Sequence, residues 1–492
     1  MKRILKTLLF AGVALNVWGC HSRIPNQSSL DLLPIMRAAL YDSCSFYFGD
    51  FGHYHKSDSE APIGVFDSGT GGLTVMDAIL TADMFNNVTG EEGADGLRDF
   101  EGEHFIYLAD QANMPYGNYA AENKVDFLRE LIVEDALFLM ERKYYASVAA
   151  SMVSADKEMV KSIVIACNTA TATGLKDIEY MLEQSGTGLS VLGVVSAGAR
   201  GALECLPKDA SATIGVMATV GTIKTEGYER TLKQMAQNLG YTGDLQVLNQ
   251  AAMGFAEAVD EEPDFVLRNL TAPRGNYRGP AIGHPEFPIK PDLLDVYNFD
   301  AENGALLIVQ GHKVEIQLNA PQNYARYHLL SLVEQLRARP QSPPLEVLVM
   351  GCTHYPYYKE TLQTMLQELR VYQKNGVYPY RDLIADEVFL IDPAVNTAKE
   401  LYLLLRKQGL LAKNASPTSA DFYITVPNTS LHGVGLDSPQ RFSYEYKYGR
   451  PTGSGLEYVK TVPFSEENID ATTLARFRSS IPTTFSLIRA FN

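Results

Sequence analysis

The chain has little cysteine, little positive charge and few long apolar runs, and each shortage excludes a class of protein. Its 492 residues include 5 cysteines, whose spacing matches neither a disulfide framework nor a CxxC metal site. The 42 basic side chains are outnumbered by 58 acidic ones, and the formal charge of −16 leaves no basic run to neutralise phosphates. We therefore expect no nucleic-acid partner and no bound metal. Beyond the N-terminus, no apolar run approaches the ~20 residues that cross a bilayer.

What is present describes an ordinary globular core. Hydrophobic residues make up 46% of the chain and charged residues 20%, which excludes a disordered or fibrous protein. The length exceeds that of one typical domain, so two lobes are expected.

The N-terminus has the pattern of a secretory signal peptide. Lys2, Arg3 and Lys6 precede a short apolar stretch that ends at a small residue before Cys20. The segment Val17–Cys20 resembles a bacterial lipobox, although Trp18 fits it poorly, and Cys20 would then carry a lipid anchor. We expect an exported, periplasmic or membrane-anchored lipoprotein that touches the membrane only through this lipid. If the leader is a wrongly assigned start, the protein is cytoplasmic.

The remaining chain alternates apolar runs with amphipathic helical patterns. The runs "IGVF", "HFIYLAD", "SIVIACN", "ATIGVMATVGT" and "LEVLVMGCTH" each precede a turn and a helix-like segment, which is typical of a parallel sheet covered by helices. "PIGVFDSGTGG" and "CNTAT" are echoed later by "TIGVMATVGTI" and "GCTHY", so two related α/β lobes are expected. The predicted fold class is α/β, with two pseudo-symmetric parallel-sheet lobes and the active site in the cleft between them.

These patterns give the following predicted organisation. Residues 1–20 are the signal peptide, 21–60 a tether, 61–194 and about 380–492 the first lobe with a loop-rich tail, and 195–379 the second lobe with a Pro/Gly-rich excursion near 262–344.

Residues with reactive side chains follow several of the predicted strands. Asp67, Asp110, Cys167, Thr219 and Cys352 all lie where an apolar run gives way to a turn. Ligands of open parallel sheets bind at the carboxyl ends of the strands, so one cleft could collect these five side chains. Cys205, by contrast, is interpreted as inert packing and Cys44 as part of the tether.

Two thiols at strand ends predict a particular chemistry. A helix N-terminus after each cysteine would lower the thiol pKa, and Thr169 and Thr353 could act as caps or ligand donors. Cys167 and Cys352 could then act on a carbon from opposite faces, one removing a proton as a thiolate and the other returning one as a thiol. Neutral donors in the turns would hold the carboxylate of an amino acid, so no cofactor is expected.

Five segments in order resemble the signature of glutamate racemases, in the cofactor-independent aspartate/glutamate racemase superfamily. They are "IGVFDSGTGGLTV", "YLADQANMPYGNY", "IVIACNTAT", "IGVMATVGT" and "VLVMGCTHYP", spread over about three hundred residues. The resemblance implies a two-lobed α/β fold with a catalytic cysteine pair, Cys167 and Cys352, assisted by Asp67 and His354. The substrate shell that it implies comprises Ser68, Pro115, Tyr116, Gly117, Asn168, Thr169, Thr219, Thr222 and Thr353.

One segment departs from the family. The stretch close to "ACPLFVPLVE", whose glutamate supports the first cysteine in the family, corresponds here to "QAAMGFAEAVDEE". The supporting acid could be Glu257, Asp260 or Glu261, and its identity stays open. The chain is also longer than family members, and an exported form is unexpected for an enzyme that supplies D-glutamate for cell-wall precursors in the cytoplasm.

The resulting functional hypothesis is racemisation of an acidic amino acid, with L-glutamate to D-glutamate ahead of aspartate. The alternatives are an amino-acid-binding lipoprotein without catalysis and another enzyme of the same superfamily, such as a decarboxylase or a hydantoin racemase. The paired "CNT" and "CTH" motifs favour racemisation over decarboxylation by a single cysteine, and a receptor has no need for both cysteines and His354. A small-molecule amino acid is the expected partner, and a homodimer remains one option for the assembly.

Overall fold

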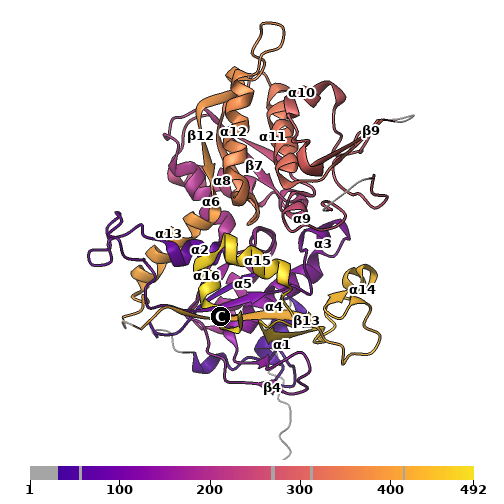
Figure 1. Ribbon diagram of the computed structural model, residues 1–492. Helices are drawn as coiled ribbons and strands as arrows, with labels where there is room; N and C mark the ends of the chain where they lie inside the picture. The colour runs from indigo at the N-terminus through magenta and orange to yellow at the C-terminus, as the bar shows by residue number, and fades with distance from the viewer. Residues whose placement is uncertain (1–31, 55–57, 268–271, 311–313, 414–415, 492) are drawn as a thin grey trace, which may run out of the picture.

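A computed structural model of the chain describes residues 32–491, apart from 55–57, 268–271, 311–313 and 414–415. The predicted signal peptide and Cys20 lie outside the described residues. Two lobes lie one above the other in Figure 1, and each is built around its own sheet. None of the helices within the described ranges has the length and apolar character needed to span a membrane.

The sheet of the first lobe has six strands in the order β16-β13-β2-β1-β5-β6. Strands β13, β2, β1, β5 and β6 pair in parallel, and β16 pairs antiparallel with β13 at the edge. The strands are β1 (Ile63–Asp67), β2 (His104–Ala109), β5 (Ser162–Ile165), β6 (Ser190–Gly193), β13 (Ser419–Pro427) and β16 (Val459–Pro463). All residues of β1 are buried, as expected of a central parallel strand covered on both faces.

The sheet of the second lobe has four parallel strands in the order β12-β11-β7-β8. They are β7 (Ala212–Ala218), β8 (Leu245–Ala251), β11 (Leu345–Gly351) and β12 (Ile384–Ile391). In chain order the two lobes share one arrangement, because β2-β1-β5-β6 and β8-β7-β11-β12 both read second, first, third, fourth. The predicted α/β class with two parallel-sheet lobes is confirmed, and the sequence echo corresponds to this repeated strand order.

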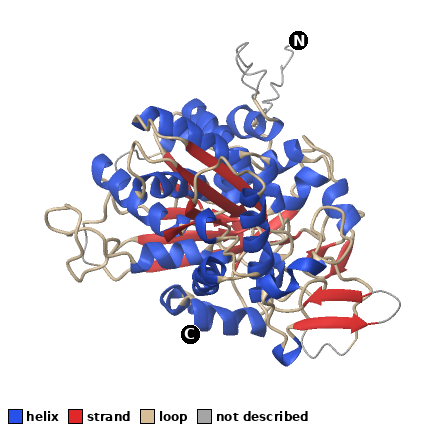
Figure 2. Ribbon diagram, turned by 90° about the horizontal axis from the view of Figure 1, so that it is seen from above, coloured by secondary structure: helices blue, strands red, loops and turns tan. Residues whose placement is uncertain are grey.

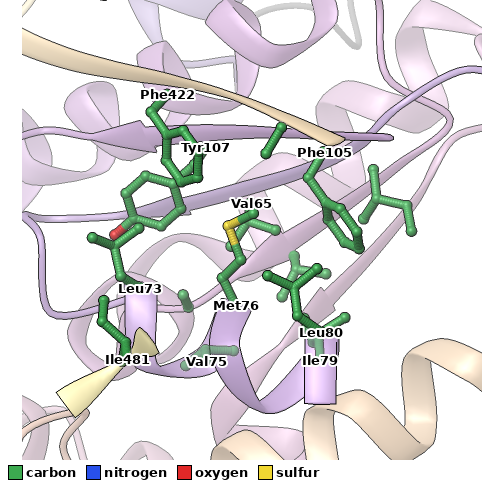
Figure 3. Packing of buried hydrophobic residues seen from close by; sticks show 14 of the residues in the cluster. Val65, Leu73, Val75, Met76, Ile79, Leu80, Phe105, Tyr107, Phe422 and Ile481 are labelled. Carbon is green, nitrogen blue, oxygen red and sulfur yellow. The ribbon is translucent and has the colours of Figure 1, made fainter. Parts of the chain in front are cut away.

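Helices cover both faces of the sheets, as the view from above shows (Figure 2). The principal ones are α2 (Leu73–Thr81), α4 (Val125–Met140), α5 (Asn168–Ser185), α6 (Val194–Glu204), α8 (Gly227–Leu239), α11 (Pro321–Arg337), α12 (Lys359–Val371) and α13 (Pro393–Gln408). In the first lobe, Leu73, Met76 and Leu80 of α2 recur at helical spacing and pack against β1 and β2 (Figure 3). Each such buried side chain contributes roughly 1.5–3 kcal/mol relative to an exposed one.

The chain passes between the lobes twice. It leaves the first sheet after β6 and enters α6, and it returns after β12 through α13. Helix α6 supplies core residues to the second lobe, α13 supplies core residues to the first, and the two helices pack on each other. The two connections are therefore adjacent.

Several segments have more structure than their sequence indicated. Residues 34–41, inside the predicted tether, form α1 and pack on α4, with Ile35, Met36 and Ala39 buried. Strands β13 and β16 of the predicted tail extend the first sheet, whereas β12, placed near the start of that tail, lies in the second sheet. The sheet that each of these strands joins is determined by pairing with distant strands, which local pattern does not show.

The remaining elements are short. They are η2 (Phe51–His53), α3 (Gly117–Ala121), β3 (Tyr144–Tyr145), β4 (Val153–Ser154), α7 (Val220–Lys224), α9 (Phe255–Val259), η3 (Pro291–Leu293), α10 (Leu294–Tyr297), η4 (Glu302–Gly304), β9 (Leu306–Gln310), β10 (Val314–Leu318), η5 (Tyr355–Tyr358), η6 (Arg381–Leu383), β14 (Leu436–Ser438), β15 (Arg441–Phe442), α14 (Tyr444–Gly449), α15 (Ala471–Ser480), α16 (Pro482–Leu487) and η7 (Arg489–Phe491).

Candidate active site

A cavity of about 660 Å³ lies between the lobes, at the carboxyl ends of both sheets. Loops after β1, β2 and β5 line it from the first lobe, and loops after β7, β8 and β11 line it from the second. The lining includes every catalytic and substrate-shell residue that the sequence indicated: Asp67, Ser68, Pro115, Tyr116, Gly117, Cys167, Asn168, Thr169, Thr219, Thr222, Cys352, Thr353 and His354. The strand-end position of these residues thus brings them into one cleft.

Two glycines let the lobes approach closely at this cleft. A Cβ on Gly221 would lie 2.4 Å from Cα of Gly117, so backbone faces backbone across the lobes. A Cβ on Gly71, in the turn after β1, would lie 2.8 Å from side-chain atoms of both Thr353 and His354. Any larger residue at either position would push the two sides of the cleft apart.

Cys167 follows β5 and is the N-cap residue of α5. Its Sγ accepts a hydrogen bond from the backbone N–H of Ala170 at 3.4 Å and lies 3.6 Å from Oγ of Ser68. The helix N-terminus is present, but the expected lowering of the pKa is wrong for this thiol. Burial and the negative charge of Asp67 raise the pKa of Cys167 and outweigh the donors at Ala170 and Ser68. Cys167 is therefore a protonated thiol at neutral pH.

Asp67 ends β1 and lies beside this thiol. Its Oδ2 accepts a hydrogen bond from the backbone N–H of Gly72 at 2.7 Å, at the start of α2, and its carboxylate also accepts one from Cys167. Burial raises the pKa of Asp67, while the Gly72 N–H and the nearby charge of His354 oppose that rise. The carboxylate is thus held in place from two sides while it contacts the thiol.

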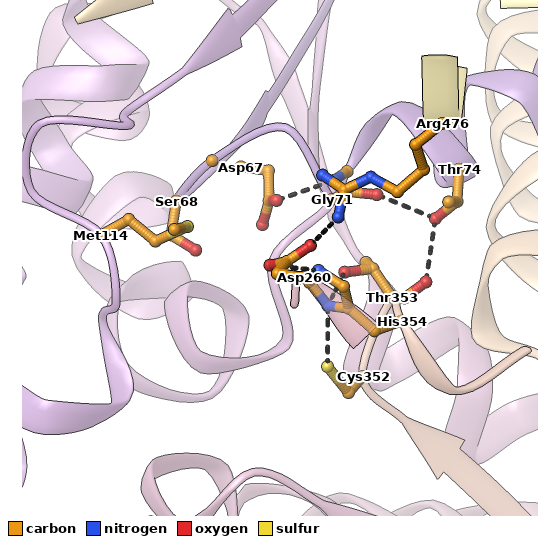
Figure 4. A network of polar contacts seen from close by, with 12 residues as sticks. Asp67, Ser68, Gly71, Thr74, Met114, Asp260, Cys352, Thr353, His354 and Arg476 are labelled. Carbon is orange, nitrogen blue, oxygen red and sulfur yellow. Dashed lines mark hydrogen bonds and ion pairs between the residues drawn. The ribbon is translucent and has the colours of Figure 1, made fainter. Parts of the chain in front are cut away.

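Cys352 lies on a turn after β11 and has a different neighbour. Its Sγ is 3.4 Å from Nδ1 of His354, whose Nε2 lies 3.1 Å from Oδ2 of Asp260. Burial opposes a charge on His354, but Asp260 and Cys352 favour the imidazolium and raise the pKa of His354 well above its usual range. The side chain is therefore a cation placed between a carboxylate and a sulfur (Figure 4).

Asp260 is one of the three acids that the sequence left open, and it is paired with His354. It contacts His354 and thus serves the second cysteine, whereas the resemblance implied support of the first. Glu257 also lines the cleft, but burial raises its pKa, and Glu261 is exposed. Although burial works against its charge, His354 and Arg476 lower the pKa of Asp260 to about 2.

Arg476 is a site residue that sequence reasoning missed. It lies on α15, near the end of the chain, and its guanidinium is paired with Oδ1 of Asp260 (Figure 4). Nothing in "DATTLARFRSSI" distinguishes this arginine from a solvent-facing one, so a single sequence offers no signal for it. The excursion and the tail also reach the cleft, through Arg278 and His284 and through Arg441 and Lys447, respectively.

The neutral part of the site is a set of hydroxyl and amide groups. Oγ1 of Thr222 lies 3.1 Å from Oγ1 of Thr169 and 3.0 Å from that of Thr219, so three hydroxyls cross from one lobe to the other. Oδ1 of Asn168 accepts a hydrogen bond from the hydroxyl of Tyr228 at 2.6 Å. Within the described ranges, no group of three or more His, Cys, Asp or Glu side chains is arranged to hold a metal ion.

Of the two roles expected for Thr169 and Thr353, helix cap or ligand donor, neither threonine fills the first. Cys167 caps α5, so Thr169 is inside the helix, and His354 precedes η5, so Thr353 is one position too early. Oγ1 of Thr353 lies 3.4 Å from Nδ1 of His354, and its carbonyl accepts a hydrogen bond from Thr74 of the first lobe at 3.3 Å. The threonines are left as donors toward the cavity.

Asp110 does not join the cleft, contrary to our expectation. It is buried, and it accepts hydrogen bonds from the hydroxyls of Tyr116 and Thr425 at 2.5 and 2.7 Å. The Tyr116 hydroxyl also lies 2.7 Å from Asp135, and burial raises the pKa of both Asp110 and Asp135. The hydroxyl of Tyr116 is thus bonded within the interior of the first lobe rather than directed at the cavity.

Known proteins resemble the chain in sequence and in structure. No family model matches the chain. It is 25% identical over 363 residues to a glutamate racemase of Oceanobacillus iheyensis, covering 74% of this chain and 86% of that protein. It is 25% identical over 393 residues to one of Chlorobaculum tepidum, covering 80% and 93%, and 34% identical over 186 residues to one of Enterococcus faecalis, covering 38% and 51%.

Solved structures of glutamate racemases also match. The one from Bacillus anthracis has a TM-score of 0.44 at 22% identity and covers 75% of this chain and 88% of its own. The one from Francisella tularensis, in complex with D-glutamate, has a TM-score of 0.40 at 22% identity and covers 74% and 88%. On the strength of the sequence matches, which span about three quarters of the chain, the resemblance indicated by the five motifs is confirmed, and this protein is a relative of the glutamate racemases.

Proposed function

We propose that this protein interconverts L- and D-glutamate by a two-base mechanism in which Cys167 and Cys352 face one substrate from opposite lobes. The observation that carries the proposal is the repeated placement of a free thiol after the third strand of each sheet, on either side of one cavity. Both thiols are free in the structure, so neither is sequestered in a disulfide.

The two thiols have neighbours of opposite charge, which supports different roles for them. Sγ of Cys352 lies 3.4 Å from Nδ1 of the cationic His354, so a negative charge that develops on this sulfur during the reaction would be stabilised by the imidazolium. The pKa of Cys167 is raised by burial and by Asp67, so it is a thiol that can give a proton. A two-base racemase needs one group of each kind at the start of a turnover.

In the proposed reaction, the Cys352 thiolate removes the α-proton from one face of the substrate. The electron pair left on the α-carbon is stabilised by donors around the α-carboxylate, for which the hydroxyls of Thr169, Thr222 and Thr353 are placed. The Cys167 thiol then delivers its proton to the other face, so the configuration inverts. The enzyme finishes with the proton on Cys352 and the negative charge on Cys167, which is the state that handles the opposite enantiomer.

Glutamate is proposed as the substrate because the sequence relatives bear that name, and aspartate is the second candidate. The cavity of about 660 Å³ accommodates either amino acid, so its size alone does not decide between them.

The test is to incubate the reduced protein with each enantiomer of glutamate, and then of aspartate, in deuterated water. We expect optical rotation to decay towards zero while deuterium enters the α-position, for glutamate faster than for aspartate. Binding without loss of rotation and without exchange would refute racemisation and support an amino-acid receptor. The double variant Cys167→Ser/Cys352→Ser is the control for adventitious racemase activity.

We further propose that the N-terminal twenty residues direct export and that Cys20 carries the lipid anchor, on the lipobox resemblance alone. Metabolic labelling with a radioactive fatty acid tests this in a bacterial host. We expect label on the wild type and none on Cys20→Ala. Equal label on both would refute the anchor and leave the catalytic proposal untouched.

A further inference from the structure

We propose that Arg476 of α15 is a positioning residue for the Cys352 side of the cleft: it fixes the Asp260 carboxylate so that His354 is held against Cys352. The four side chains form one chain of contacts. Asp260 uses one oxygen for each partner, Oδ1 for Arg476 and Oδ2 for His354 at 3.1 Å, and Nδ1 of His354 lies 3.4 Å from the sulfur. Figure 4 shows the carboxylate between the guanidinium and the imidazole.

The position of Asp260 explains why a second donor matters. It is the C-cap residue of the short helix α9, so its backbone is at the end of an element rather than inside one. A carboxylate bonded at one oxygen can rotate about its side-chain torsions, whereas one bonded at both oxygens is fixed in two directions. Because the contact between His354 and Cys352 depends on where the carboxylate holds the ring, fixing Asp260 fixes the imidazole as well.

Burial adds an electrostatic argument. Asp260 and His354 are 18% and 14% exposed at their side chains, and Arg476 is 27% exposed. A largely buried carboxylate needs compensation, and here positive groups lie on both sides of it. Removing Arg476 would leave one cation for the carboxylate and would let it turn towards solvent.

Arg476 belongs to a segment fixed to the other lobe. Phe477 of α15 and Phe485 of α16 are part of the core of the first lobe, and both the backbone N–H and the hydroxyl of Thr484 donate to Asp77 of α2 at 2.9 Å. Asp260 and His354 follow strands of the second lobe. The Arg476–Asp260 pair therefore joins the lobes, and the geometry of the Cys352 side depends on their relative position.

Arg476 is not among the residues that line the cavity, which separates its role from substrate binding. We expect Arg476→Gln to lower kcat about ten- to a hundredfold while KM changes little. Arg476→Lys keeps the charge with a single donor nitrogen and should recover part of kcat. Arg478→Gln is the matched control, because Arg478 is on the same helix but lies over the ring of Phe485, at 5.2 Å from the centroid.

The kcat prediction rests on the proposed function. A second measurement needs no turnover, so it tests this inference separately. We expect Arg476→Gln to slow alkylation of Cys352 by iodoacetamide severalfold, measured peptide by peptide in a mass spectrometer, with Cys167 unchanged. Unchanged alkylation of Cys352 in a folded Arg476→Gln protein would overturn the positioning role, even if the wild type proved not to be a racemase.

Folding is checked by circular dichroism and thermal melting. If Arg476→Gln fails to fold, Arg476→Met retains the aliphatic part of the side chain and removes the charge, and the same two readouts apply. A structural role alone would lower the melting temperature and leave kcat and the Cys352 alkylation rate of the folded fraction at wild-type values, which would also overturn the inference.

Discussion

The two lobes repeat one strand order and place a cysteine after the third strand of each, yet the two cysteines have opposite neighbours. Cys167 caps a helix and lies beside the carboxylate of Asp67, whereas Cys352 lies on a turn beside the imidazolium of His354. The fold thus sets where the sulfurs are, and the loops set which charged group lies beside each sulfur. A symmetric pair of thiols would start in the same protonation state, and two-base chemistry needs them to differ.

Removing either sulfur should have the largest effect, because one lobe then loses its acid or base. We expect Cys167→Ser and Cys352→Ser each to lower kcat/KM for racemisation by about 10²–10⁴-fold, because a serine hydroxyl is a far weaker acid than a thiol at the positions of a general acid and base. The measurement is loss of optical rotation with each glutamate enantiomer. Each variant should still exchange the α-proton of only one enantiomer, and a different one for each variant. Full activity in either single variant would contradict the two-base assignment.

The reactivity of the two thiols tests the difference between them without substrate. At pH 7 we expect iodoacetamide to modify Cys352 at least about tenfold faster than Cys167, since the thiolate is the reactive form and the pKa of Cys167 is raised. His354→Asn should remove most of that preference, because the cation that faces the Cys352 sulfur is lost. Peptide mapping by mass spectrometry gives both rates. Faster modification of Cys167 would contradict the proposed roles of the two thiols.

The contact between the lobes is tested at its two glycines. Gly221→Ala places a Cβ against the backbone of Gly117 and should cost about 1–3 kcal/mol of stability, because neither backbone can yield easily. Gly71→Ala meets side-chain atoms of Thr353 and His354 instead, so it should cost less stability and still lower kcat by displacing His354. Urea unfolding and steady-state kinetics separate the two effects. A Gly221→Ala protein with wild-type stability would mean that the lobes are not held this close.

The charge on the Cys352 side predicts a pH dependence of stability. The pKa of Asp260 is lowered from 3.8 to about 2 in the folded protein, so its contribution, on the order of 2 kcal/mol, is present above pH ~4 and is lost as pH falls towards 2. The pKa of His354 is raised, so its contribution is present below pH ~6.5 and is lost as pH rises through the folded value. The free energy of unfolding of the wild type minus that of Asp260→Asn should therefore decrease at both ends. A difference independent of pH would contradict the pairing.

The smallest effect is expected at the third free thiol. Cys205 is half-buried at the end of α6, and its Sγ donates to the carbonyl of Gly201 at 3.3 Å. It is not among the residues that line the cavity. Cys205→Ser should change stability by no more than about 0.5 kcal/mol and leave kcat unaltered. A large loss of activity would show that the asymmetry involves more than the two cleft thiols.

The sequence predicted the position of the site better than the side-chain contacts and pKa values within it. Strand-end positions and the paired motifs gathered all of the predicted shell into one cavity, because the carboxyl ends of parallel strands converge whatever the loops contain. The same argument failed at Asp110, whose side chain turns into the core. It also failed for the pKa of Cys167, since the helix N-terminus is visible in a sequence whereas burial beside Asp67 depends on packing.

Contacts between residues far apart in the chain could not be predicted from the sequence for a related reason. The contact of Arg476 with Asp260 joins positions 216 residues apart, and neither has a motif of its own. The places of the last two strands of the first sheet are determined by pairing rather than by local pattern, since β13 lies beside β2 and β16 lies beside β13. Local sequence pattern predicts helices and strands, and long-range contacts determine which of them pack together.

The double passage of the chain between the lobes has a mechanical consequence. The two connections, at α6 and α13, lie side by side, and we expect such a pair to allow rotation of the lobes about one axis and to restrict twisting. An opening movement of that kind would carry Cys352 away from Cys167 along an arc and return it along the same arc, so the sulfurs would resume the same alignment after each product leaves.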